Sequence, residues 1–309
     1  MSVSQECPDK LFMYFRKENF KKFLTNHSLK FSDLTKVNDP FELKIDFKKS
    51  MIDTGFRDTY DSESLNDKDI ELLQDGQTDN LKHYGVACFT ETDTNVLMWA
   101  YYGEGQQGVC VEFDTSEDKL FFKDTHKVQY KGHFESIKKG ESSFNYIDVL
   151  TTKSLDWKHE REWRVIKLNY ANQLLPINPR AIKSIILGAN LMDYRGINEE
   201  LSKTYMEIFD LLKRPEYSHV MIKQIQIDQT EYKMHSNEVP FIVYSAGENI
   251  VIISLKEQCA EIKDVMTDEL IYSANMLKWE KLTIPKPRST YLLYDPSKES
   301  GYIRIRNVE

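Results

Sequence analysis

Three charged side chains in one short stretch have the types and spacing that could do chemistry on a strand. Glu160, Glu162 and Arg164 follow one another at every second position. From Glu162 onward the sequence predicts a strand, with Trp163 and Val165 on the opposite face. Next-but-one residues of a strand lie about 6.6 Å apart, so the two carboxylates would share one cleft wall. They could then hold a sugar hydroxyl or accept a proton, and the arginine would keep them ionised by lowering their pKa.

The same Glu-x-Glu-x-Arg pattern has a second interpretation. It is typical of the solvated side of a half-buried sheet, where the charges do no chemistry. From composition alone, this second interpretation is the stronger one. The choice therefore depends on what the rest of the chain contains.

The elements that must position these residues alternate between strands and helices. Strands are predicted at residues 11–16, 29–32, 84–90, 108–114, 181–188 and 220–227. Helices are predicted at about 18–26, 95–102 and 198–213. Residues 50–80 form a polar, mostly helical segment, which we expect to close at Asp75-Gly76-Gln77.

Composition and charge are those of a soluble globular protein. The 309 residues allow one large or two small domains, and 40% hydrophobic residues can build a sizeable core. The net charge of -8 gives no global field that would attract nucleic acid. Lysines nevertheless cluster near residues 17–22, 44–49 and 119–139. Such runs are typical of solvated faces, with a local patch for a polyanion as the alternative.

Cysteine usage and hydropathy indicate a cytoplasmic protein. The four cysteines, Cys7, Cys88, Cys110 and Cys259, include no Cys-x-x-Cys pair, which argues against a structural zinc site. Cys88 and Cys110 lie in apolar runs and are predicted to be packed thiols. No apolar run approaches the ~18 residues of a membrane span, and the first residues do not resemble a signal peptide.

The last part of the chain differs from the rest in its pattern of strand-like runs and prolines. Its strand-like runs are residues 241–245, 250–255, 290–294 and 302–305, punctuated by prolines. We therefore expect a β-rich extension over residues 238–309, after a domain at residues 1–237. A contact with a neutralising partner or a target is the hypothesis for this extension.

Seven short motifs in this order resemble a widespread bacterial family that has been catalogued only as a domain of unknown function. They are Tyr14-x-Arg16, Asn38-Asp39-Pro40-Phe41-Glu42, Cys88-Phe89-Thr90-Glu91, Met98-Trp99-x-x-Tyr102, Gly108-Val109-Cys110-Val111-Glu112-Phe113, Trp157-x-x-Glu160-x-Glu162-Trp163-Arg164 and Ile185-Ile186-Leu187-Gly188. Each motif alone is weak, whereas the ordered set is specific. The resemblance covers about residues 10–230. Some members of that family lie in phage-defence loci.

The pattern is in turn similar to the ADP-ribosyltransferase superfamily. There an Arg or His on the first strand, a Ser-Thr-Ser or Tyr on a later strand, and a Glu, often in Glu-x-Glu, on a third strand form the site for nicotinamide adenine dinucleotide (NAD). The corresponding residues here are Tyr14 or Arg16, Thr90, Glu160 and Glu162. One departure is Cys88, which stands where the first Ser would be.

This resemblance implies a fold and a set of roles. The fold would be α+β, with mixed or antiparallel central sheets and flanking helices. Glu162 would bind the ribose hydroxyl and stabilise the cation that develops as the nicotinamide–ribose bond breaks. Glu160 would orient or deprotonate the acceptor, and Arg16 would bind the pyrophosphate or ribose.

The remaining binding residues follow from the same resemblance. Thr90 would support Glu162 by a hydrogen bond, and Asn38 would shape the rim of the cleft. Trp99 and Tyr102 would sandwich the nicotinamide or an acceptor base, with core packing as the alternative for Trp99. NAD would be the substrate, and no metal is expected.

Three functions remain open from the sequence. The first is an NAD-dependent ADP-ribosyltransferase that modifies nucleic acid or protein, as a toxin with a neutralising antitoxin or as a phage-defence effector. The second is a non-catalytic binding or sensor module, in which Glu160, Glu162 and Arg164 form a structural ion-pair network. The third is a magnesium-dependent nuclease that uses Asp39, Glu42 and the two glutamates. A pocket at the Glu-x-Glu face would favour the first, and burial in salt bridges the second.

Overall fold

The fold of the chain combines short helices with several sheets, as predicted for the α+β class. The computed structural model describes residues 6–53, 66–136, 145–192, 207–239, 241–246, 249–255, 257–264, 267, 269–285, 291–294 and 302–305. Strand pairing is mixed, because β11 (Ile182–Leu187) and β12 (Met221–Ile227) run parallel whereas β4 (Tyr84–Thr90) and β9 (Glu162–Leu168) run antiparallel. Within the described residues, no helix is long and apolar enough to cross a membrane.

The chain divides into two compact units, each built from separate segments. The first unit comprises Met1–Met13, Asn26–Leu97 and Phe113–Ala181, and the second comprises Tyr14–Thr25, Met98–Glu112 and Ile182–Glu309. The boundary expected at residues 237/238 falls at the end of strand β13 (Met234–Glu238), inside the second unit. A separate catalytic domain over residues 1–237 stays a prediction.

The first unit is organised around an antiparallel run of strands. Its strands follow the order β1-β4-β9-β6, and β3 pairs with β4. They are β1 (Lys10–Phe15), β3 (Ser32–Asp33), β4 (Tyr84–Thr90), β6 (Thr125–Lys127) and β9 (Glu162–Leu168). Two smaller sheets pair β2 (Ser28–Lys30) with β10 (Leu174–Pro176), and β7 (Gln129–Lys131) with β8 (Thr152–Ser154).

Alternation along β4 and β9 separates two sides of this run. Leu81, Val86, Leu150 and Ile166 belong to a buried cluster on one side. Phe89 packs edge-to-face against Phe113 and Phe122 in an aromatic cluster. The α-helices in the described part of this unit are α2 (Phe47–Asp53), α3 (Asp67–Leu81) and α5 (Tyr146–Leu150).

Helix α3 corrects one prediction. A capping box at Asn66 starts the helix, which then continues through Gly76 to Leu81. We expected the helical segment to end at Asp75-Gly76-Gln77, because glycine favours helix ends. Packing of Leu81 into the buried cluster outweighs the weak helix propensity of one glycine. Residues 54–65 of the predicted segment lie outside the described residues.

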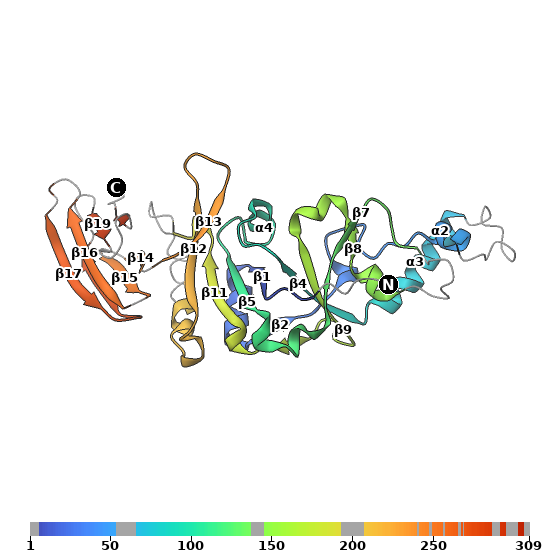
Figure 1. Cartoon of the computed structure of the whole chain (residues 1–309), viewed down its shortest axis with the longest axis horizontal. Coiled ribbons are helices and arrows are strands. Elements are labelled where there is room, and N and C mark those ends of the chain that lie inside the picture. The colour runs from blue at the N-terminus through green and yellow to red at the C-terminus, as the bar shows by residue number, and fades with distance from the viewer. Residues whose placement is uncertain are drawn as a thin grey trace. The chain divides into compact units, whose positions relative to one another are not determined.

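The second unit contains a parallel pair of strands, β11 and β12. Its strands follow the order β13-β12-β11-β5, and β12 and β13 form a long hairpin (Figure 1). The elements are α1 (Lys17–Asn26), α4 (Val96–Tyr101), β5 (Val109–Asp114), β11 (Ile182–Leu187), β12 (Met221–Ile227) and β13 (Met234–Glu238). Residues 207–212 are helical, and the helix ends before Arg214-Pro215 as expected. Residues 198–206 of that predicted helix lie outside the described residues.

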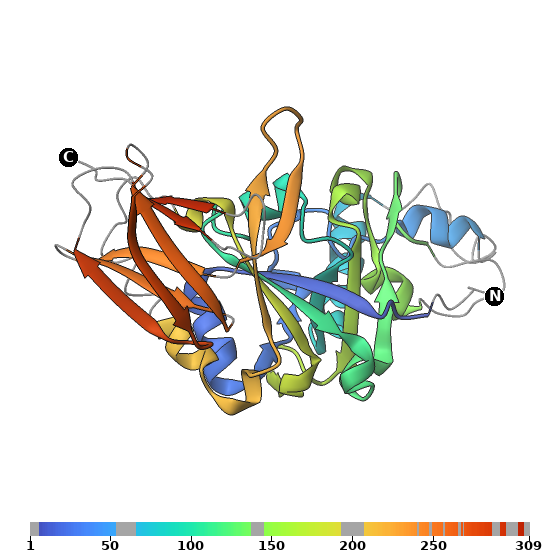
Figure 2. The same ribbon diagram turned by 60° about the vertical axis from the view of Figure 1, so that its left-hand side comes forward.

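The C-terminal extension is β-rich, as predicted. One sheet has the order β14-β15-β18 and the other β17-β16-β19-β20, drawn in orange to red in Figure 2. The strands are β14 (Phe241–Ala246), β15 (Asn249–Ser254), β16 (Gln258–Asp264), β17 (Leu270–Met276), β18 (Lys281–Pro285), β19 (Tyr291–Tyr294) and β20 (Tyr302–Ile305). Phe241, Ile252, Ile262 and Met276 form their shared core. The sequence patterns did not reveal β16, β17 and β18.

A glycine pair tests how tightly the second unit is packed around Trp99. A Cβ at Gly188 would lie 2.2 Å from the Gln106 carbonyl oxygen and 3.1 Å from the Trp99 ring. We expect Gly188→Ala to destabilise the protein by about 1–3 kcal/mol through overpacking. Gly76→Ala, which meets nothing within 4 Å in helix α3, should instead stabilise by about 0.5–1 kcal/mol. Urea unfolding of both variants checks this; a neutral Gly188→Ala would contradict the tight approach.

Candidate functional site

The Glu-x-Glu stretch lies at the start of β9, beside β4. Thr90 pairs with Glu162, and Cys88 pairs with Arg164. These four side chains therefore share one face of the strand pair, as the predicted alternation requires. Trp163 lies on the other face, where its Nε1 donates to Glu91 at 2.9 Å.

Glu160 comes close to Glu162, with which it shares the Lys153 ammonium, but it is not part of β9. It ends a 3₁₀ turn at Leu155–Glu160, and Arg161 then takes a left-handed conformation with φ 45°. This turn redirects the chain into β9, so Glu160 is outside the strand. The Thr90 hydroxyl fixes the turn by donating to the Glu160 carbonyl at 2.6 Å. Thr90 thus supports the pair through the backbone of Glu160, whereas the expected bond was to Glu162.

Arg164 is the centre of a buried charge network. Its side chain is 1% exposed, and its guanidinium donates twice to Glu162, at 2.9 and 3.1 Å. It also donates twice to Glu42, at 2.8 and 3.2 Å, and once to the Leu150 carbonyl at 2.6 Å. These five bonds use all five N–H donors of the guanidinium. We call Glu42, Lys153, Glu160, Glu162 and Arg164 the charge network.

Lys153 joins the two glutamates of the motif. Its ammonium lies 2.5 Å from a Glu160 oxygen and 3.2 Å from a Glu162 oxygen. Burial alone would raise the pKa of the Glu162 carboxyl, but the charges of Arg164 and Lys153 outweigh burial and lower this pKa to about 2. Glu162 is therefore ionised at neutral pH although its side chain is only 6% exposed.

Cys88 corrects a second prediction. The sequence predicts a packed thiol, yet Cys88 is exposed, whereas Cys110 is buried as expected. The Cys88 thiol is within hydrogen-bonding reach of the Glu162 carboxylate, and surrounding protein and the Glu162 charge raise the pKa of this thiol well above its ordinary value. An apolar strand pattern predicts the backbone correctly, but it cannot tell which position of one face stays uncovered.

The other predicted binding residues are distributed over both units. Asn38 is exposed in the first unit, two residues before a turn in which Asp39 accepts the Phe41 N–H at 2.9 Å. The second unit holds Tyr14, Arg16, Trp99 and Tyr102.

Within the second unit, Trp99 is a core residue. It is fully buried and packs edge-to-face on Tyr14 with 5.0 Å between ring centroids. This confirms the packing alternative for Trp99. Tyr102 is partly exposed, and Arg16 is exposed directly after β1.

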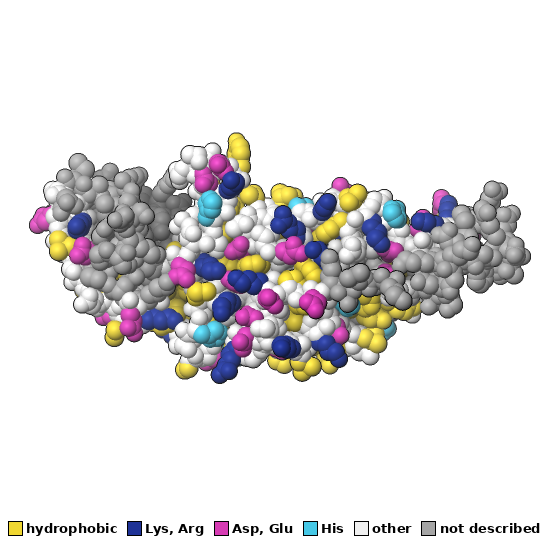
Figure 3. Space-filling model, in the orientation of Figure 1, with side chains coloured by type: hydrophobic (Ala, Val, Ile, Leu, Met, Phe, Trp, Pro, Cys, Tyr) yellow, Lys and Arg dark blue, Asp and Glu magenta, His cyan; other side chains and the backbone are white. Residues whose placement is uncertain are grey.

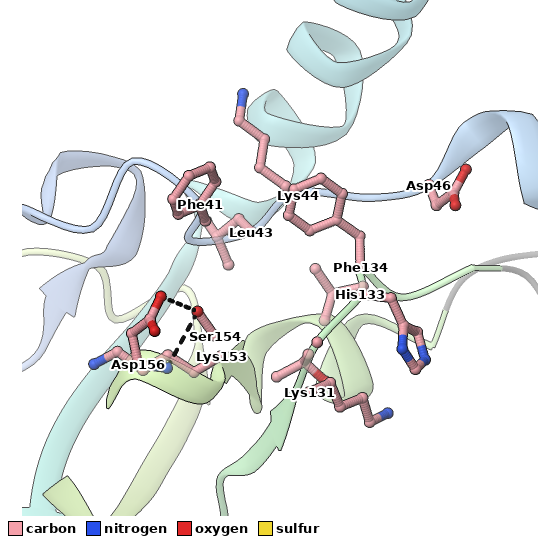
Figure 4. Close-up of a pocket in the computed structure, with 13 residues that line it drawn as sticks. Phe41, Leu43, Lys44, Asp46, Lys131, His133, Phe134, Lys153, Ser154 and Asp156 are labelled. Atoms are coloured by element: carbon pink, nitrogen blue, oxygen red, sulfur yellow. Dashed lines mark hydrogen bonds between the residues drawn. The ribbon is translucent and has the colours of Figure 1, made fainter. Parts of the chain in front are cut away.

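A pocket of about 400 Å³ lies next to the charge network. Its lining residues are Phe41, Leu43, Lys44, Asp46, Lys131, Gly132, His133, Phe134, Val149, Thr152, Lys153, Ser154 and Asp156. They come from three segments of the first unit, as Figure 4 shows. Lys153 belongs to both the pocket wall and the charge network.

The sequence assigned no role to Lys153, and it assigned Glu42 a role only in the nuclease alternative. Glu42 closes the Asn-Asp-Pro-Phe-Glu motif, and Lys153 opens the stretch that contains the glutamates. Their charges and their positions in these motifs were the only available signals. Within the described residues, no group of three or more His, Cys, Asp or Glu side chains could hold a metal ion.

Comparison with known families gives one match. The model of a family described as protein of unknown function (DUF2971) matches residues 98–165. This part of the chain is similar to that family, which agrees with the expected likeness to a domain of unknown function. The matched segment contains Lys153, Glu160, Glu162 and Arg164, whereas Glu42 and Cys88 lie outside it. The comparisons with curated proteins and with solved structures gave no significant match.

Removing the central guanidinium should strongly destabilise the first unit. Arg164→Gln would leave Glu42 and Glu162 buried without their shared cation, and breaking a buried ion pair costs about 3–5 kcal/mol. Exposed Arg180 provides a matched control, and Arg180→Gln should stay within about 0.5 kcal/mol of wild type. Urea unfolding at pH 7 measures both. Equal stability of the two variants would contradict a structural role for the network.

Acid should also weaken the fold through Glu162. Because its folded pKa of about 2 lies below the ordinary value of 4.5, the unfolded chain binds more protons between these values. The contribution, about 3 kcal/mol, is complete above pH 4.5 and is lost as the pH falls toward 2. Glu162→Gln should flatten the decline in unfolding free energy below pH 4.5, and exposed Glu71→Gln should not. An unchanged slope in Glu162→Gln would refute this assignment.

Proposed function

We propose that the chain is an NAD-dependent ADP-ribosyltransferase that acts on a macromolecule, nucleic acid or protein, as a toxin or phage-defence effector. The observation that carries the proposal is the state of Glu162. Its carboxylate is buried, has a pKa of about 2, and is in reach of the exposed Cys88 thiol. A fixed negative charge therefore lies within reach of an exposed residue.

Such a charge suits cleavage of the nicotinamide–ribose bond. Positive charge develops on the ribose as this bond breaks, and a preorganised carboxylate stabilises it without reorganising at that moment. Arg164 and Lys153 offset the cost of keeping Glu162 ionised in a buried place. Glu160, which binds the same ammonium, is the residue that we propose to orient or deprotonate the acceptor.

The geometry also defines what must move. Both Glu162 oxygens already accept hydrogen bonds, from Arg164 and Lys153. A ribose hydroxyl therefore takes the place of the Cys88 thiol or of the Lys153 ammonium. Arg164 stays in place, because its other donors bind Glu42 and Leu150.

A second candidate function has its own observation. The side chains of Glu160, Glu162 and Arg164 are 3%, 6% and 1% exposed, and each has an ion-pair partner. This is the arrangement expected for a structural network in a non-catalytic binding or sensor module. In that case the glutamates hold the pocket wall in place and do not react.

Cleavage of labelled NAD separates these two functions. We would compare wild type with Glu162→Gln and with Cys88→Leu, supplying cell extract as acceptor. The proposal predicts label on a macromolecule, at least a hundredfold less in Glu162→Gln, and a loss in Cys88→Leu, whose larger side chain covers Glu162 without removing a core residue. Glu71→Gln, an exposed glutamate on helix α3, is the control and should match wild type.

Each outcome of the NAD-cleavage experiment decides a different point. Nuclease or protease sensitivity of the labelled product would identify the acceptor class. If folded wild-type protein neither cleaves nor binds NAD, the transferase proposal fails and the binding module remains. Retained cleavage in a folded Glu162→Gln variant would likewise reject the role given to this carboxylate.

A further inference from the structure

We infer that the pocket of the first unit binds a nucleoside phosphate, either free or as one unit of a single-stranded nucleic acid. The inference goes beyond the proposed function and does not depend on NAD cleavage. It is carried by the side chains that line the pocket and by how they are held.

The first feature is a pair of exposed aromatic rings. Phe41 is 55% exposed and Phe134 is 41% exposed, although large apolar side chains usually pack inside. Their centroids are 6.4 Å apart with the planes tilted by 35°, so the rings contact each other. A base therefore stacks on the exposed side of this pair, because no space for it exists between the rings. Stacking on an aromatic side chain accepts every base.

The second feature is a set of three lysines around the rings. Lys44, Lys131 and Lys153 line the pocket together with the imidazole of His133 and two carboxylates, Asp46 and Asp156. Lys131 is ion-paired with Glu135, and Lys153 with Glu160 and Glu162.

Both carboxylates are engaged locally. Asp46 accepts the Lys49 N–H at 2.9 Å, and the Ser154 hydroxyl donates to Asp156 at 3.0 Å, as drawn in Figure 4. The exposed Lys44 makes no ion pair with a carboxylate of the described residues. Phosphate is the anion that such rim lysines bind as point charges.

The third feature is that the walls of the pocket are fixed. The side chain of Gln74 on α3 accepts the Ile45 N–H at 3.1 Å and donates to the Leu43 carbonyl at 3.0 Å. On the facing segment, the Glu135 carbonyl accepts the Asp46 N–H at 2.8 Å. Little ordering cost therefore remains for a ligand, and a volume of about 400 Å³ lies in the range of small-ligand pockets, about 300–1,000 Å³.

The charge pattern of the chain disfavours a long polyanion as the ligand. In Figure 3, Lys and Arg are interspersed with Asp and Glu over the described part of the face shown. The chain as a whole carries a net charge of -8. A long polyanion gains no continuous cationic track on such a surface. Recognition of a single base and its phosphate, within the pocket, is consistent with both facts.

Calorimetric titration of the full chain tests this inference. The probes are AMP, GMP, CMP and UMP at low salt, with adenosine and inorganic phosphate as partial ligands. We expect at least one monophosphate to bind at least tenfold more tightly than adenosine or phosphate alone. Labelled six-nucleotide RNA and DNA strands form a second arm. Tighter binding of a strand identifies nucleic acid as the source, and preference for the monomer identifies a free nucleotide.

Matched variants locate the binding. Phe134→Leu keeps apolar bulk but loses the ring, and should weaken binding at least about fivefold. Lys44→Ala should weaken it and reduce its salt dependence. Exposed Lys119→Ala, the same substitution as Lys44→Ala outside the pocket, and exposed Leu120→Ala, which truncates another exposed apolar residue, should match wild type. No binding of any monophosphate or strand by folded protein overturns the inference, as does binding that both pocket variants leave unchanged.

Discussion

The buried guanidinium of Arg164 is the constraint on which the first unit depends. An unpaired charge at this depth would cost several kcal/mol, so the surrounding chain must supply acceptors in fixed directions. Those acceptors come from three separate places: Glu162 on the same strand, Glu42 in the loop after Asp39-Pro40, and the Leu150 carbonyl at the end of α5. One side chain thereby ties a strand, a loop and a helix together.

The same constraint sets the position of the pocket. Phe41 and Leu43 flank Glu42 in the chain, so the bond between Glu42 and Arg164 fixes the backbone that carries both lining residues. Gln74 holds the next residues by two hydrogen bonds to the backbone. Charge pairing therefore adds to the apolar packing of Leu43 and Ile45 in fixing this segment. This explains why a large aromatic side chain such as Phe41 can remain exposed without losing a defined position.

Periodicity in the sequence predicted the strands that carry the site, because β4, β9 and β11 have strong apolar patterns that need little tertiary information. It could not predict the partners of Arg164, since Glu42 lies 122 residues away and no local pattern joins them. The exposure of Cys88 was missed for a related reason: whether a strand position is covered depends on what packs above it. The sequence also did not predict the left-handed conformation of Arg161, which places Glu160 outside the strand.

Lys153 is where the charge network and the pocket meet. Its ammonium binds Glu160 and Glu162, while the same residue lines the pocket wall. Burial lowers the pKa of this ammonium, but the two carboxylates more than reverse that effect and raise it, so Lys153 is a permanent cation at neutral pH. A substitution of Lys153 would therefore disturb stability, the ionised state of Glu162 and the pocket together. Cys88, Phe134 and Lys44 each touch only one of these features, which makes them the residues at which chemistry, ligand binding and folding can be distinguished.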